Sequence, residues 1–156
     1  MKLSDKLAVL GQVLRWRLTW TRRDLDFCPD DVDAELKRIE DTIKQGDAVL
    51  IMTGADEYWG KQEYLMKGCG MGRDSTLHIL NMGVNVVGTD AWSWDAPFSH
   101  TARRWAETKD PAIIWEGHKA GRIRPYYQIE KLTKDLRAEL GKLFELKMEA
   151  QKQELK

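Results

Sequence analysis

Hydrophobic positions at helical spacing predict an amphipathic helix near the amino terminus. Leucines recur every three or four residues, at Leu3, Leu7, Leu10, Leu14 and Leu18. This spacing is the period of one helix face, and Ser4 is a suitable capping residue. We therefore expect a helix over 4–21 that packs on the domain. The alternative is a helix that binds a membrane surface or a partner.

Helical and strand-like patterns then alternate along the chain. They predict, in order, a helix over 31–45 closed by Gly46, a strand over 47–53, a short helix over 58–66, a glycine-rich turn over 67–72, a helix from 74 or 75 to 82, a strand over 84–89, a helix over 99–108, candidate strands over 112–115 and 126–130, and a charged helix from 132 onward. The order helix, strand, helix, strand is typical of a sheet with helices packed against it. We expect a single α/β domain over 1–156 with helical extensions at both ends.

Composition narrows the classes of function. The 156 residues carry 25 basic and 25 acidic side chains, so net charge gives no reason to expect nucleic acid or a membrane as partner. The charged residues Asp5 and Lys6 interrupt the amino-terminal segment early, so we do not expect it to be a signal peptide. No apolar run reaches the roughly 18 residues that a membrane helix needs. A reducing cytoplasm fits the two cysteines, although a Cys28–Cys69 disulfide stays open.

Candidate chemistry lies where strands are predicted to end. Asp90 directly follows the strand over 84–89, and Trp92 and Trp94 come next, which resembles the lining of a pocket. The alternative for Asp90 is a turn residue. His118 follows the apolar run over 112–115, and strand ends are common places for catalytic groups in α/β folds. His78 and His100 fit packing or capping roles better.

Several ordered blocks resemble the cyclase family of metal-dependent hydrolases, which includes bacterial kynurenine formamidase and isatin hydrolase. The blocks are Gln45–Gly54 (QGDAVLIMTG), Gly83–Phe98 (GVNVVGTDAWSWDAPF), Trp115–Arg122 (WEGHKAGR) and Tyr127–Leu132 (YQIEKL). They extend over about two-thirds of the chain. The resemblance therefore places a cyclase-like core at 31–132, and it implies part of a swivelling β/β/α fold.

The resemblance also implies a metal site and a substrate class. Family members use zinc or manganese to open an amide or lactam, and the matching ligand positions here are His118 and Glu130. Asp90, Trp92 and Trp94 match the substrate side, so an aromatic amide or lactam is the expected small-molecule partner. Relatives are usually dimers or tetramers, which implies a homo-oligomer.

One departure from the family leaves three hypotheses open. The family's main metal motif, His-x-Gly-Thr-His-x-Asp-x-Pro-x-His, lies upstream of the matched blocks, whereas Met1–Asp30 contains no histidine. The chain could be an active metal-dependent hydrolase, or a degenerate relative that acts as a binding or assembly module. A third hypothesis is an engineered or rearranged fragment, because the segment after Leu132 is rich in leucine, lysine and glutamate.

Overall fold

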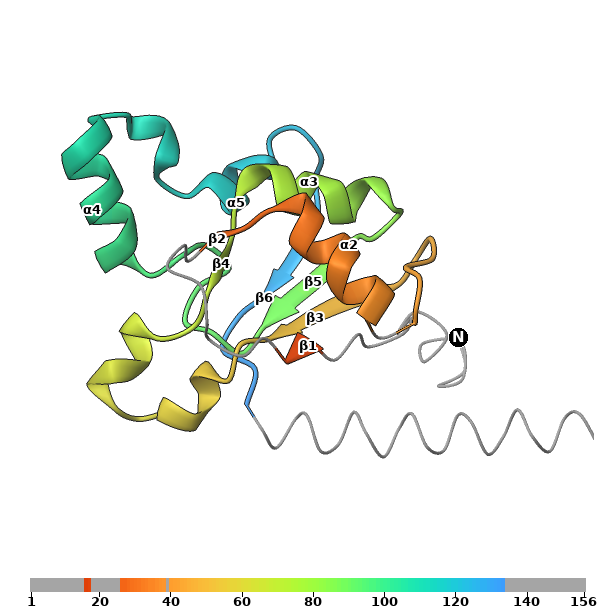
Figure 1. The fold of residues 1–156 in the computed structure, drawn as a ribbon, viewed down its shortest axis with the longest axis horizontal. Helices are drawn as coiled ribbons and strands as arrows, with labels where there is room; N and C mark the ends of the chain where they lie inside the picture. Colours follow the sequence, from red (N-terminus) through yellow and green to blue (C-terminus); the bar gives the residue numbers. More distant parts are fainter. Residues whose placement is uncertain (1–15, 18–25, 39, 134–156) are drawn as a thin grey trace, which may run out of the picture.

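Parallel strands form the centre of the molecule (Figure 1). The computed structural model describes residues 16–17, 26–38 and 40–133. A four-stranded sheet has the order β1 (Trp16–Arg17), β3 (Ala48–Met52), β5 (Val86–Thr89) and β6 (Tyr127–Ile129). A second pair joins β2 (Asp26–Phe27) to β4 (Gly70–Met71). All these pairings are parallel, which confirms the predicted α/β class.

Parallel pairing requires crossover connections, and helices supply them. The α-helices are α2 (Pro29–Arg38), α3 (Arg73–Asn81), α4 (Phe98–Thr108) and α5 (Glu116–Ala120). Short 3₁₀ helices are η1 (Ala55–Tyr58), η2 (Gln62–Met66) and η3 (Pro111–Ile113). In Figure 1, α2 and α3 lie beside each other against the sheet, while α4 and the η1–η2 segment extend past the carboxyl ends of β5 and β3.

The core lies between the central strands and the helices α2 and α3. Val49, Ile51 and Val87 of β3 and β5 are buried against Val32 of α2 and Ile79 of α3. This packing agrees with the apolar run of β3, since strands of parallel sheets covered by helices are rich in apolar residues. The predicted strands over 47–53 and 84–89, and the candidate strand over 126–130, are therefore confirmed with slightly shorter bounds.

The predicted helix over 4–21 is wrong at 16–17. Trp16 and Arg17 pair in parallel with Ile51 and Met52, and so form an edge strand of the sheet. Ladder partners on β3 outweigh local helix propensity there, as tertiary context often does. The rest of that prediction lies outside the described residues. The terminal helix predicted from 132 onward is not formed at 132–133, and its remainder over 134–156 also lies outside the described residues.

The predicted helix over 31–45 ends earlier than its hydrophobic pattern suggested. The N–H of Glu40 donates to the Lys37 carbonyl, and the N–H of Asp41 donates to the Leu36 carbonyl. Glu40 has φ 55°, so the helix closes with a left-handed residue in the Schellman arrangement that glycine usually provides. Gly46 instead lies in a later turn, where its N–H donates to the Gly83 carbonyl.

The candidate strand over 112–115 is also wrong. Asp110 accepts a hydrogen bond from the N–H of Ala112 (2.8 Å) and caps η3, with Pro111 in the first turn. Capping and proline together favour a helical turn over an extended chain. His118 consequently lies within α5 and not after a strand.

Two further expectations concern cysteines and membranes. Cys28 and Cys69 are not joined to each other, so the disulfide left open by the sequence is absent. Within the part of the chain that the structure describes, no helix has the length and apolar character that crossing a membrane requires.

Candidate functional site

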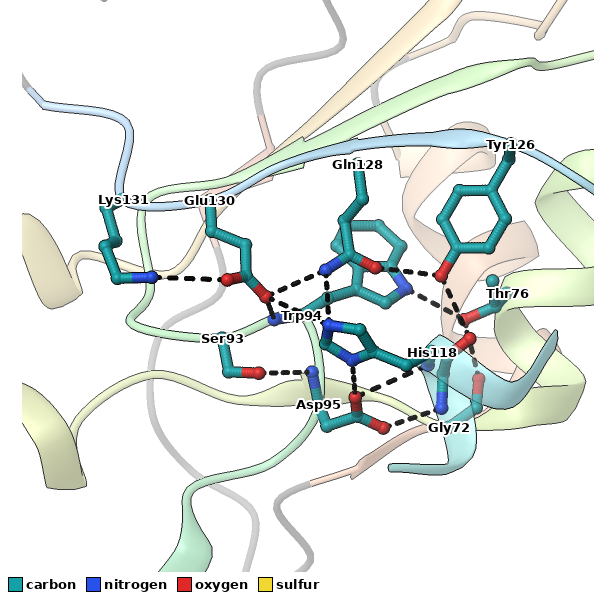
Figure 2. A network of polar contacts seen from close by, with 11 residues as sticks. Gly72, Thr76, Ser93, Trp94, Asp95, His118, Tyr126, Gln128, Glu130 and Lys131 are labelled. Carbon is teal, nitrogen blue, oxygen red and sulfur yellow. Dashed lines mark hydrogen bonds and ion pairs between the residues drawn. The ribbon is translucent and has the colours of Figure 1, made fainter. Parts of the chain in front are cut away.

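Polar side chains from β6 and from the residues just before and after it point to one face of the sheet. Tyr126, Gln128 and Glu130 occupy alternate positions, and alternate side chains of a strand share a face. Figure 2 shows all three directed toward His118, which comes from α5. The Gln128 amide nitrogen donates to the Glu130 carboxylate (2.8 Å), and the Tyr126 hydroxyl lies 2.9 Å from the Gln128 amide oxygen.

Asp95 fixes the position of α5. Its carboxylate accepts hydrogen bonds from the N–H groups of Gly117 (2.6 Å) and His118 (3.4 Å), which are free donors at the start of a helix. Trp115, just before the helix, has a left-handed backbone with φ 57°. At Gly117 a Cβ atom would lie 2.4 Å from the Met71 carbonyl oxygen, so only glycine permits this approach. The start of α5 is therefore held against β4 and the loop after β5.

The two predicted metal ligands converge. His118 Nε2 lies 3.6 Å from Glu130 Oε1, although the residues come from different elements. The other ring nitrogen, Nδ1, is hydrogen-bonded to the Asp95 carboxylate. In the neutral ring this bond keeps the proton on Nδ1 and leaves the lone pair of Nε2 facing Gln128 and Glu130.

Carboxylates set the charge state of His118. The hydrogen bond with Asp95 raises the pKa of His118 above its ordinary value, and the charges of Asp95 and Glu130 act in the same direction. Partial burial and the positive charge of Lys131 oppose that rise. Burial and the same two carboxylates also raise the pKa of Tyr126, which keeps its hydroxyl protonated.

Glu130 is held from several sides. Its Oε1 accepts a hydrogen bond from the backbone N–H of Trp94 (2.8 Å), while its Oε2 lies 3.2 Å from Lys131 Nζ. The carboxylate thus has one oxygen toward His118 and the other toward a lysine. This division fixes the direction of the Oε1 lone pairs at the site.

Asp90 has a structural role next to the site. Its carboxylate is buried and accepts hydrogen bonds from the N–H (2.7 Å) and hydroxyl of Thr53 and from the N–H of Gly54 (2.8 Å). Burial raises the pKa of Asp90, and these bonds oppose the rise. Asp90 thereby ties the end of β3 to the end of β5. Its predicted role in substrate binding stays a prediction.

The two tryptophans that follow Asp90 lie in different surroundings. Trp94 is buried in the core, where its indole N–H donates to the Thr76 hydroxyl (2.9 Å). Trp92 is 40% exposed and lines a solvent-open pocket with Cys69, Phe98 and Trp115. Asp95 also lines this pocket, so one carboxylate is shared by the pocket and the His118 network. The predicted roles of Trp92 and Trp94 in substrate binding stay predictions.

Comparison with known proteins identifies the family. The family model described as "Putative cyclase" matches residues 3–96, more than half of the chain. The chain belongs to the cyclase family. The match starts upstream of the expected core over 31–132, and it ends before His118 and Glu130. No match was found among curated proteins.

A solved structure shows the same fold as this cyclase-family chain. It is the crystal structure of an isatin hydrolase bound to the product analogue thioisatinate, with a TM-score of 0.59 and 15% sequence identity. The similarity covers 81% of this chain and 48% of that chain. The cyclase-family chain thus spans about half the length of the isatin hydrolase, and the likeness extends to the fold alone.

The donor atoms present fit two positions of a metal site. An imidazole nitrogen and a carboxylate oxygen 3.6 Å apart suit zinc or manganese, and Asp95 on the far ring nitrogen is the support that metal-bound histidines usually have. Across residues 16–17, 26–38 and 40–133, however, no group of three or more His, Cys, Asp or Glu side chains could hold a metal ion. His118 and Glu130 are therefore a pair of donors, not a closed site.

Sequence reasoning missed Asp95, Gln128 and Tyr126 as members of this network. The alternation of positions 126, 128 and 130 could have found two of them, because it places Tyr126 and Gln128 on the same face of the strand as Glu130. Asp95 had no such signal. Its contact with the start of α5 joins segments 22 residues apart, and α5 itself was not predicted.

Proposed function

We propose that this chain is a cyclase-family hydrolase that opens an amide or lactam bond with the help of a divalent metal. The observation that carries the proposal is the convergence of His118 Nε2 and Glu130 Oε1 to 3.6 Å. Asp95 on Nδ1 prepares the ring for this role, since it turns the Nε2 lone pair toward Glu130 and the Gln128 amide. Family membership supports hydrolysis as the class of reaction.

His118 and Glu130 would hold the metal, with zinc or manganese as the candidates. Such a metal, when bound, lowers the pKa of water and polarises a carbonyl group. The chain's own residues orient the donors: Asp95 holds the imidazole, and the Trp94 N–H and Gln128 amide hold the Glu130 carboxylate. The Tyr126 hydroxyl in turn contacts the Gln128 amide.

An aromatic amide or lactam is the substrate class that we propose. Trp92, Phe98 and Trp115 line the pocket that also contains Asp95, and aromatic walls favour flat organic ligands. Trp115 also lies over the His118 ring, with a centroid distance of 5.7 Å. A substrate ring that lies against these walls would therefore be close to the His118 network.

The second candidate is a non-catalytic relative that binds or assembles with a partner. The incomplete donor set favours it, because structural and catalytic zinc sites use three or four protein ligands and the described residues offer two. In this case the network around His118 would serve to dock α5 on the sheet. Partner binding would then survive the loss of His118 and Glu130.

Metal binding separates the two candidates. Protein purified without an affinity tag would be titrated with Zn²⁺ and Mn²⁺ by calorimetry, and then assayed on aromatic amides and lactams. We expect His118→Ala and Glu130→Ala each to weaken metal binding by at least about tenfold. His78→Ala is the matched control, because His78 pairs with Asp33 on the helices α2 and α3. Failure of the wild type to bind either metal would contradict the proposal and favour the second candidate.

A further inference from the structure

Lys131 contacts both the donor pair and the aromatic pocket. Its Nζ lies 3.2 Å from Glu130 Oε2 and 4.5 Å from the centroid of the Trp92 ring. Trp92 is a wall of the pocket, and Glu130 is one of the converging donors. A single ammonium group therefore lies between the donor pair and the pocket wall at Trp92.

The backbone of Lys131 is unusual in a way that favours a positional role. Its φ is 62°, in the left-handed region that residues other than glycine and asparagine seldom adopt. The N–H of Lys131 donates to the Ala91 carbonyl (3.1 Å), and the N–H of Leu132 donates to the Thr89 carbonyl (3.0 Å), so the sheet holds this conformation in place. Strained residues that the surrounding structure maintains tend to cluster at functional sites.

We infer that Lys131 is a positioning residue that couples the pocket wall to the donor pair. Its ammonium group binds Oε2 of Glu130 and leaves Oε1 toward His118 and the Trp94 N–H (Figure 2). The same group stacks on Trp92, so the position of this ring determines where the ammonium lies. A ligand that moves Trp92 would thereby change the direction of the Glu130 carboxylate.

A solvated surface lysine is the simpler alternative. The side chain of Lys131 is 33% exposed, which is less than a freely solvated lysine shows, and two contacts hold its end. The chain offers a matched control in Lys109, whose Nζ lies 4.4 Å from the Trp105 ring centroid on α4, whereas the ion pairs of Glu130 among the described residues are with His118 and Lys131. The two lysines thus differ in the contact with Glu130.

The inference rests on the proposed function only for the importance of Glu130, and its test needs neither metal nor substrate. The backbone amide proton of Trp94 reports on Glu130, because it donates to Oε1. The indole proton of the same residue donates to Thr76 and reports on the core. Both signals would be followed by ¹H–¹⁵N NMR in the full chain.

We expect Lys131→Met to move the Trp94 amide proton upfield, since the carboxylate loses the partner that orients it, and to leave the indole proton in place. Lys131→Arg should restore the amide signal, and Lys109→Met should leave it unchanged. Trp92→Leu should also move the amide proton, and this effect should vanish in the Lys131→Met background, as coupled residues require.

An unchanged Trp94 amide in both Lys131→Met and Trp92→Leu would overturn the inference. If Lys131→Met also moves the indole proton, the core is disturbed. Trp92→Leu then decides: it should move the Trp94 amide proton and leave the indole proton in place. Failure of the wild type to bind metal would remove the proposed function but not the coupling. The NMR and calorimetric results can therefore fail separately.

Discussion

At the scale of single residues, His118 depends on Asp95 more than on any other neighbour. The hydrogen bond between them is the largest cause of the raised pKa of His118, and it also selects the ring nitrogen that faces Glu130. Without the aspartate, the tautomer would depend on the contact between Nε2 and the Gln128 amide. The chemistry of the site is thus decided by a residue that sequence reasoning did not single out.

The raised pKa of His118 predicts a pH-dependent stability. Protonated His118 is favoured in the folded state, so its contribution is complete below the unfolded value near 6.5 and is lost as pH rises through the raised folded value. We expect the wild type to exceed His118→Gln in free energy of unfolding by more at pH 6 than at pH 9. Urea denaturation at both pH values measures this difference. A gap that widens toward pH 9 would show that the sign is wrong.

Gly117 predicts a steric effect at one position. An added Cβ would lie 2.4 Å from the Met71 carbonyl oxygen and 2.7 Å from Cδ1 of the buried Trp94, and neither neighbour can move freely. Gly117→Ala should therefore destabilise the protein by about 1–3 kcal/mol, as overpacking does. Gly72→Ala, whose Cβ would meet its nearest atom at 3.9 Å, should cost less than about 1 kcal/mol. Equal melting temperatures of the two variants would contradict this account.

At the scale of elements, α5 is a short helix that a carboxylate from another segment holds in place. Five residues are too few for a helix to be stable alone, so α5 depends on tertiary contacts. Asp95 satisfies two N–H groups at its start, and the Tyr126 hydroxyl lies 2.9 Å from the Gly117 carbonyl oxygen. These contacts, not the local sequence, place His118 opposite β6.

Removal of the Asp95 carboxylate should destabilise the protein more than removal of an ordinary cap. We expect Asp95→Ala to lower the free energy of unfolding by about 2 kcal/mol or more, because loss of the buried carboxylate leaves the N–H groups at the start of α5 unpaired. Asp110→Ala removes the exposed cap of η3 and should cost at most about 1 kcal/mol. Chemical denaturation of both variants at pH 7 compares them. An equal or smaller loss in Asp95→Ala would refute the capping role.

At the scale of the whole molecule, β6 lies at one end of the order β1-β3-β5-β6 among the strands that the structure describes. Tyr127 is 75% exposed and Ile129 is 44% exposed, so this edge strand presents apolar side chains to solvent. Open strand edges with apolar residues favour pairing with another chain. We therefore propose, in line with the expectation from the family resemblance, that the protein forms a homo-oligomer through β6.

Light scattering after size-exclusion chromatography tests this proposal. We expect the wild type to have a mass above that of one chain and the double variant Tyr127→Lys, Ile129→Lys to have the mass of a monomer, because charges on an edge strand oppose pairing. Trp105→Lys changes an exposed apolar residue of α4 and should not alter the mass. A monomeric wild type at all concentrations would exclude the proposal.

The sequence by itself determined the class of fold and the strongest elements. The apolar run over 47–53 predicted β3, and the valine-rich segment over 84–89 predicted β5. The ordered motif blocks indicated the cyclase family, and they named His118 and Glu130 as a pair. These features are local or sequential, so they can be recognised without coordinates.

Only the tertiary structure decided how the site is assembled. The edge strand at 16–17, the early end of α2 and the helix that carries His118 all follow from contacts between distant segments, which local propensity does not contain. Trp92 and Trp94 look equivalent in sequence, yet one lines a pocket and the other fills the core. The reason is that burial and hydrogen-bond partners depend on the whole packing arrangement, and packing is fixed only when the sheet and its helices come together.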